Sequence, residues 1–282
     1  MIYSNKSLDT TKFIEVAENY YAEIEGWLDK YPSEKHRELC KCISARRNNL
    51  TFTGQSSCAI RPIPRTDSYE NRPHCITEVS KGSDLIRWRY GEADQDATII
   101  DDIRVASPIR TICDLAKEDS PKSLLVSVNH CLYNKDFTKN QLLSELDKRD
   151  IRWKNKIIKV LKFATDKCES PLETIAWIAI NNAGFVLPKQ QERLYDKRIF
   201  IGRVDMSWDI GENKIILELD GMGKYKDAKD LHLEKIREGK LHRQGHKIIR
   251  ATWGDVTKGK LLTMLEDANI PKRRSYKRAI IK

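Results

Sequence analysis

Several features are missing from this 282-residue sequence, and each absence argues against a class of protein. No run of about 18 apolar residues occurs, which argues against a membrane-spanning helix. The first residues, MIYSNKSLDTTKFIEV, lack the basic-then-apolar order of a signal peptide. Internal repeats and low-complexity blocks are missing too. We therefore expect a charge-rich globular protein that is cytoplasmic and has no membrane partner.

Paired cysteines are also missing. Seven cysteines are scattered along the chain without a CxxC pair, and the spacing of Cys40 and Cys42 does not match a structural zinc site. Because free cysteine packs as a small hydrophobic residue, we expect reduced and mostly buried thiols. No HExxH motif links the histidines, so they are interpreted as ordinary helix and strand residues.

Positive charge, in contrast, is in excess. Lysine and arginine number 51 against 41 acidic residues, a formal net charge of +10. This excess favours a polyanionic partner, with nucleic acid first, although it is also compatible with solubility alone. The length allows two domains of about 100–200 residues each.

The first half predicts a smaller α+β domain over residues 1–155. Residues 11–47 are predicted to be helical from the spacing of their apolar side chains, with a break at Pro32. Residues 50–105 alternate like strands and are rich in turns. Three helix starts follow, at Ser107, Pro121 and Thr138.

The second half, residues 160–270, predicts an α/β (α+β) fold in which an open mixed sheet is flanked by helices. A helix capped by Ser170 and ended by Gly184 comes first. Strands are predicted in QQERLYD, RVDMSW and KIILELDG, followed by a charged helix, the strand HKIIRATW and a last helix from Asp255. Residues 271–282 form a basic tail.

The stretch RVDMSWDIGENKIILELDG predicts a β-hairpin that carries three acids, Asp205, Glu218 and Asp220. Glu218 and Asp220 are two residues apart and therefore point to the same side of their strand. Because the turn makes the two strands antiparallel neighbours, the three carboxylates are expected to converge on one patch. Gly221 directly afterwards indicates a sharp turn or a close approach.

Carboxylates this close raise one another's pKa unless a cation lies between them. The cation could be Lys224, Lys226 or Lys235. Lys224 and Lys235 are also candidates for stabilising transition-state charge or for orienting an attacking water. It could instead be Mg²⁺ or Mn²⁺; Mg²⁺ typically binds one or two carboxylates and keeps several waters. A third alternative is that the acids simply lie on a solvated sheet face. Two roles are possible for Glu173. Its spacing from Ser170 matches a capping box, and its carboxylate could instead be a fourth acid of the site.

The order of these features resembles the PD-(D/E)XK nuclease fold: a helix that carries an acid, the pair VD on one strand, a hairpin, and ELDG on the next strand. More narrowly, it resembles the Vsr-like branch related to very-short-patch-repair endonucleases. The resemblance covers about residues 165–265 and implies a restriction-endonuclease-like fold with Mg²⁺ or Mn²⁺ at Asp205, Glu218 and Asp220. The catalytic set would be Asp205, Glu218, Asp220, Lys224 and Glu173. DNA-backbone contacts from the tail are expected of Lys272, Arg273, Arg274, Lys277 and Arg278.

The segments SSCAIRPIP, ITEVSKGSDLIRWRYGE and IRVASPIRTICDLAK resemble the antitoxin of AbiE abortive-infection (type IV toxin–antitoxin) systems. That resemblance implies DNA as a partner, and a cognate toxin or defence protein as a further one. Our main hypothesis is a Mg²⁺-dependent DNA endonuclease of a bacterial phage-defence or repair type. The alternatives are a non-catalytic DNA-binding antitoxin or transcriptional repressor, and a protein-interaction module.

Overall fold

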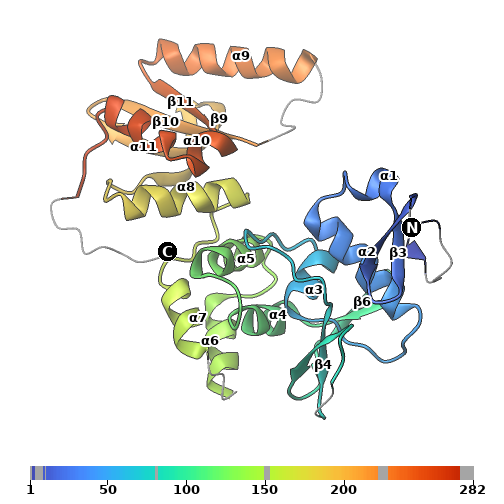
Figure 1. Ribbon diagram of the computed structural model, residues 1–282. Helices are drawn as coiled ribbons and strands as arrows, with labels where there is room; N and C mark the ends of the chain where they lie inside the picture. The colour runs from blue at the N-terminus through green and yellow to red at the C-terminus, as the bar shows by residue number, and fades with distance from the viewer. Residues whose placement is uncertain are drawn as a thin grey trace. The chain divides into compact units, whose positions relative to one another are not determined.

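The computed structural model folds into two compact units, Met1–Ala164 and Thr165–Lys282, each of which mixes helices and strands (Figure 1). It describes residues 2–3, 9, 11–79, 82–148, 153–221 and 228–273, without the side chains of 2–3, 228–231 and 233. Within these ranges, no helix is long and apolar enough to cross a membrane.

The first unit begins with strands where the sequence predicts a helix. β2 (Phe13–Ala17) and β3 (Tyr20–Glu23) pair as an antiparallel hairpin, and β1 (Ile2–Tyr3) pairs with β3. Asn19 makes the turn in the left-handed conformation, φ 60°. The helical prediction is wrong here because β3 buries alternate side chains, which is strand rather than helix periodicity. Apart from the four-residue α1 (Ile24–Trp27), it is confirmed only from Pro32 onward, where α2 (Pro32–Ser44) begins.

The helix starts predicted at Ser107, Pro121 and Thr138 are all confirmed, and Ser107 Oγ accepts the N–H of Arg110 as an N-cap. The remaining elements of the unit are α1 (Ile24–Trp27), α3 (Gly54–Ile60), β4 (His74–Thr77), β5 (Arg87–Tyr90), β6 (Thr98–Ile100), β7 (Ile103–Val105), α4 (Pro108–Leu115), α5 (Pro121–Tyr133), α6 (Lys139–Lys148) and α7 (Lys154–Leu161).

Helix α3 lies at the centre of the first unit, and all seven of its residues are buried. Its polar side chains are satisfied by neighbours: Ser56 Oγ lies 2.8 Å from His36 Nε2, and Ser57 Oγ accepts from Thr111. The cysteines are free, and all but Cys42 are buried, as predicted.

The second unit contains a four-stranded sheet in the order β11-β10-β9-β8. β10 runs antiparallel to β9 and parallel to β11, so the predicted mixed sheet is confirmed. The predicted element order is also confirmed, except that the last helix is split in two. The elements are α8 (Pro171–Asn182), β8 (Lys189–Asp196), β9 (Ile199–Ile210), β10 (Asn213–Asp220), α9 (Ala228–Arg243), β11 (Lys247–Thr252), α10 (Trp253–Thr257) and α11 (Lys260–Asp267).

Helices cover both faces of this sheet (Figure 1). α9 covers one face, where Leu241 packs with Leu194, Val204 and Ile216 in a buried apolar cluster. α8, α10 and α11 lie on the other face. The acids of the hairpin therefore lie in a sheet that has a helical layer on each side.

Candidate functional site

The predicted hairpin is present, and its pairing stops at the first acid. Residues of β9 and β10 pair in register as far as Met206 with Leu217. One residue further, Asp205 Oδ2 accepts the backbone N–H of Leu219 at 2.8 Å. The Asp205 carboxylate thus accepts a hydrogen bond from β10 just beyond the last regular pair of β9 and β10.

Glu218 and Asp220 point to the same side of β10, as strand periodicity predicts, and each binds an arginine. Glu218, only 4% exposed, accepts from Arg237 Nη2 of α9 at 2.9 Å. Both oxygens of Asp220 lie 3.1 Å from Arg250 Nη1 of β11. Arginines thus supply a cation at each of these two acids; of the lysines predicted for this role, Lys224 and Lys226 lie outside the described residues.

Further acids from α9 surround the same two arginines. Glu234 Oε1 accepts from both Arg237 and Arg250, at 2.7 and 2.8 Å, and Glu238 binds Arg250 as well. Among the described residues, the carboxylates of Glu218, Asp220, Glu234 and Glu238 thus share the guanidinium groups of Arg237 and Arg250.

Glu173 acts in a helix cap, in a slightly different way from the predicted capping box. Ser170 Oγ accepts the N–H of Glu173 at 3.2 Å, which makes Ser170 the N-cap of α8. The Glu173 carboxylate accepts from the hydroxyl of Ser170 and from the backbone N–H of Glu169, not of Ser170. Its third donor is Gln191 Nε2, 2.9 Å away on β8.

Glu173 is also close enough to Asp205 for their charges to interact. Burial, and then the negative charge of Asp205, raise the pKa of Glu173 to about 7 against the lowering effect of its hydrogen bonds. Glu173 is 6% exposed. The structure thus brings together these two acids, one on α8 and one on β9.

Gln191 is a residue of this site that the sequence analysis missed. It falls between the β8–β9 pairs Gln190–Met206 and Glu192–Val204, opposite Asp205, and it has a φ of 54°. A non-glycine residue in this left-handed conformation is strained, and such strain is concentrated at functional sites. In the sequence, the only sign of Gln191 is that a glutamine side chain lies within a predicted strand, and this signal is weak.

The raised pKa of Glu173 makes the unit's stability depend on pH. Between pH 4.5 and about 7, the unfolded chain loses the Glu173 proton before the folded chain does. Folding stability contributed by this group is therefore full below pH 4.5 and falls as pH rises through that window. We expect the melting temperature of Glu173→Gln to rise relative to that of the wild type as the pH increases from 5 to 8. A difference between the two melting temperatures that does not change with pH would contradict a raised pKa of Glu173.

Part of the predicted site lies outside the described residues, namely Lys224, Lys226, Arg274, Lys277 and Arg278. Lys235 is exposed on α9. Lys272 lies over the Phe185 ring and donates to Glu266 at 2.9 Å. Arg273 donates to the backbone oxygen of Asn181 at 2.8 Å. These two tail residues thus pack against α8 and α11.

The first unit contains a group that could hold a metal ion, formed by Glu70, His74 and Glu118, whose ligand atoms lie within 4.8 Å of one another. Burial, with the charge of Arg89, lowers the pKa of His74 to about 4, so its imidazole is neutral at pH 7. Arg89 already bonds both His74 and Glu118. Among the described residues, Asp205, Glu218 and Asp220 do not form a group whose ligand atoms all lie within 4.8 Å of one another.

No protein-family model, curated protein or solved structure matches this chain significantly. Function must therefore be inferred from the geometry of the two units and from their charges.

Proposed function

We propose that the second unit is a restriction-endonuclease-like, divalent-metal-dependent nuclease that hydrolyses phosphodiester bonds in DNA. The observation that carries this proposal is the meeting of buried Glu173 with Asp205 at the point where the β9–β10 ladder ends. Glu218 follows on the adjacent strand. Metal-dependent hydrolysis of a phosphodiester uses oxygen ligands for a hard cation beside a group that can take a proton, and these residues supply groups of both kinds.

The donor set fits Mg²⁺ or Mn²⁺. Burial is the largest cause of the raised pKa of Glu173, and the negative charge of Asp205 adds to it; a cation beside the two carboxylates would relieve this repulsion. Asp205 and Glu218 would hold the ion, with Asp220 at the edge of the site. When bound, such an ion lowers the pKa of a coordinated water and polarises the phosphodiester.

The protein's own groups would position and move the proton. Burial raises the pKa of Glu173 independently of Asp205, so this carboxyl group suits the role of general base or acid beside a bound ion. Gln191 orients it by a hydrogen bond from β8. Lys224 stays a predicted contributor of positive charge. The net charge of +10 favours DNA as the substrate, with a toxin or defence protein as a further partner.

The direct test is plasmid cleavage by the full chain. We expect supercoiled DNA to be nicked or linearised in Mg²⁺ or Mn²⁺ and to stay intact in EDTA. Intact plasmid, single-stranded DNA and branched DNA under all metal conditions would contradict the proposal.

A second candidate is a non-catalytic DNA-binding antitoxin or repressor that uses the nuclease-like fold as a platform. The pairing of Glu218 with Arg237 and of Asp220 with Arg250 favours it, because guanidinium groups already take positions next to two of the proposed metal ligands. Calorimetry separates the candidates: the repressor binds DNA near its own gene but gives no heat with Mg²⁺ or Mn²⁺.

A further inference from the structure

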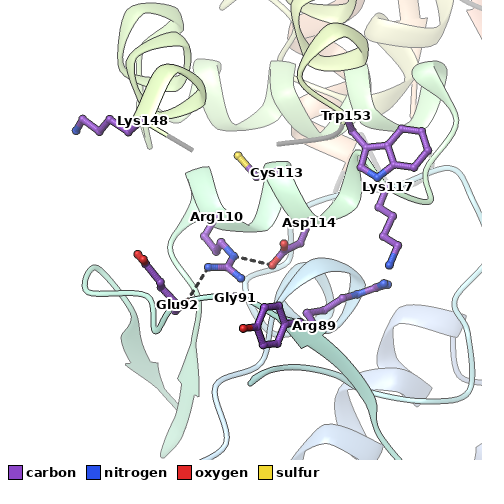
Figure 2. Close-up of a pocket in the computed structure, with 10 residues that line it drawn as sticks. Arg89, Gly91, Glu92, Arg110, Cys113, Asp114, Lys117, Lys148 and Trp153 are labelled. Carbon is purple, nitrogen blue, oxygen red and sulfur yellow. Dashed lines mark hydrogen bonds and ion pairs between the residues drawn. The ribbon is translucent and has the colours of Figure 1, made fainter. Parts of the chain in front are cut away.

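A cavity of about 500 Å³ lies in the first unit, on the side of α4 that faces the end of β5 (Figure 2). Its volume falls in the range of pockets for small molecules, roughly 300–1,000 Å³. The lining comes from segments that are far apart in the sequence. The lining residues are Arg89, Tyr90, Gly91, Glu92, Arg110, Cys113, Asp114, Lys117, Lys148 and Trp153.

Arg110 is held rigidly in this cavity (Figure 2). It is 5% exposed, its Nε donates to Asp114 Oδ2 at 2.9 Å, and its Nη1 donates to the backbone oxygen of Glu92 at 3.0 Å. The backbone of Gly91 runs so close that a Cβ there would lie 2.9 Å from Arg110 Nη2. With a φ of 153°, this position requires glycine. The guanidinium is therefore a preorganised group rather than a mobile surface charge.

Four cationic side chains line the cavity, Arg89, Arg110, Lys117 and Lys148, together with the acids Glu92 and Asp114. Arg89 is paired with Glu118, and Lys148 lies 3.6 Å from Glu145. Asp114 is already neutralised by Arg110 and also accepts from Thr53 Oγ1 at 2.5 Å. Lys117 is exposed. Arg110 and Lys117 together suit a phosphate group, because a guanidinium group donates to phosphate oxygens in a fixed geometry and a lysine adds a mobile positive charge.

Aromatic rings accompany these cations. Tyr90 is 79% exposed, so its ring adds little to the core, and Trp153 provides a second ring in the lining. Exposed rings beside cations are the combination with which proteins stack nucleic-acid bases while binding the phosphates. An inorganic anion could not stack on the rings, and a purely apolar ligand could not pair with the cations.

We propose that this cavity binds a nucleoside phosphate, with the phosphate on Arg110 and Lys117 and the base stacked on Tyr90. The ligand could be a free nucleotide or an unpaired nucleotide of a DNA strand, which share this chemistry. The site is in the first unit and does not depend on the nuclease proposed for the second.

The test measures binding of a fluorescent, 5′-phosphorylated single-stranded oligonucleotide to the full chain in EDTA, so that metal-dependent cleavage cannot destroy the probe. We expect Tyr90→Ala and Lys117→Glu each to weaken binding about tenfold, and Lys117→Glu to reduce its salt dependence. Both side chains are exposed, so both variants should fold. Tyr90→Phe keeps the ring, and Lys12→Glu reverses an exposed charge away from the cavity; both should bind like wild type.

Competition identifies the source of the ligand. Displacement by deoxynucleoside monophosphates would assign the site to free nucleotides, and oligonucleotide binding without displacement would assign it to an unpaired nucleotide within a strand. The proposal is overturned if neither ligand binds, or if Tyr90→Ala and Lys117→Glu bind as tightly as wild type. It is also overturned if inorganic phosphate competes as well as the mononucleotide.

Discussion

Replacing Asp205 with asparagine is expected to reduce the proposed metal-dependent DNA cleavage about a thousandfold, because a loss of about 4 kcal/mol of metal-assisted stabilisation corresponds to that change in rate. Asparagine keeps the shape of the side chain and an oxygen that can accept the Leu219 N–H, as Asp205 Oδ2 does. The fold should therefore survive while the negative charge is lost. The rate of plasmid nicking at fixed Mg²⁺ measures the effect.

Asp209→Asn is the matched control on the same strand. Asp209 pairs with Lys189 and Lys214, and its side chain is half exposed. Exposed ion pairs contribute little to stability, and this one is not among the acids that meet Glu173. Asp209→Asn should cleave like wild type. A comparable loss in both variants, or less than about a tenfold loss in Asp205→Asn, would remove Asp205 from the site.

Replacing Asp119 with alanine is expected to destabilise the first unit by about 3–5 kcal/mol, the typical cost of leaving one member of a buried ion pair without its partner. Arg65 and Asp119 are 3% and 1% exposed. The pair is bidentate: Arg65 Nε and Nη2 donate to the two Asp119 oxygens at 3.0 and 2.5 Å. Ser123 Oγ donates to the same carboxylate at 2.8 Å. Equilibrium unfolding in urea measures the change.

The exposed pair of Arg37 with Asp101 provides the comparison, and Asp101→Asn should leave the unfolding midpoint nearly unchanged. Removing both buried charges, in Arg65→Met with Asp119→Leu, should recover much of the lost stability, because no charge is then left uncompensated. Equal effects of Asp119→Ala and Asp101→Asn would show that the buried pair does not stabilise the unit.

Local chemistry made much of the second unit predictable. Ser170 before Pro171 set the start of α8, and Gly184, at φ 79°, follows its end. Period-two alternation placed Glu218 and Asp220 on one side of β10. These features depend on residues near one another in sequence, so the sequence alone can predict them.

Features that depend on distant residues could not be predicted. Arg250 stands beside Glu218 only because β11 pairs with β10 in parallel, and no local pattern fixes that register. Helix α3 was missed because its small and polar residues are buried by the rest of the unit. The helix predicted near Phe13 failed for a related reason: tertiary packing of β3 decided between two possible periodicities.

The parallel pairing of β10 with β11 also bears on the order of folding. β8, β9 and β10 are joined by short connections, and antiparallel hairpins of this kind close within microseconds. β11 must wait for a long crossover that contains α9, and such non-local pairing is slow. Arg250 arrives with β11, so the carboxylate of Asp220 gains this partner only when the last strand docks. A partly opened second unit, with β11 undocked, would therefore present Asp220 without its Arg250 partner.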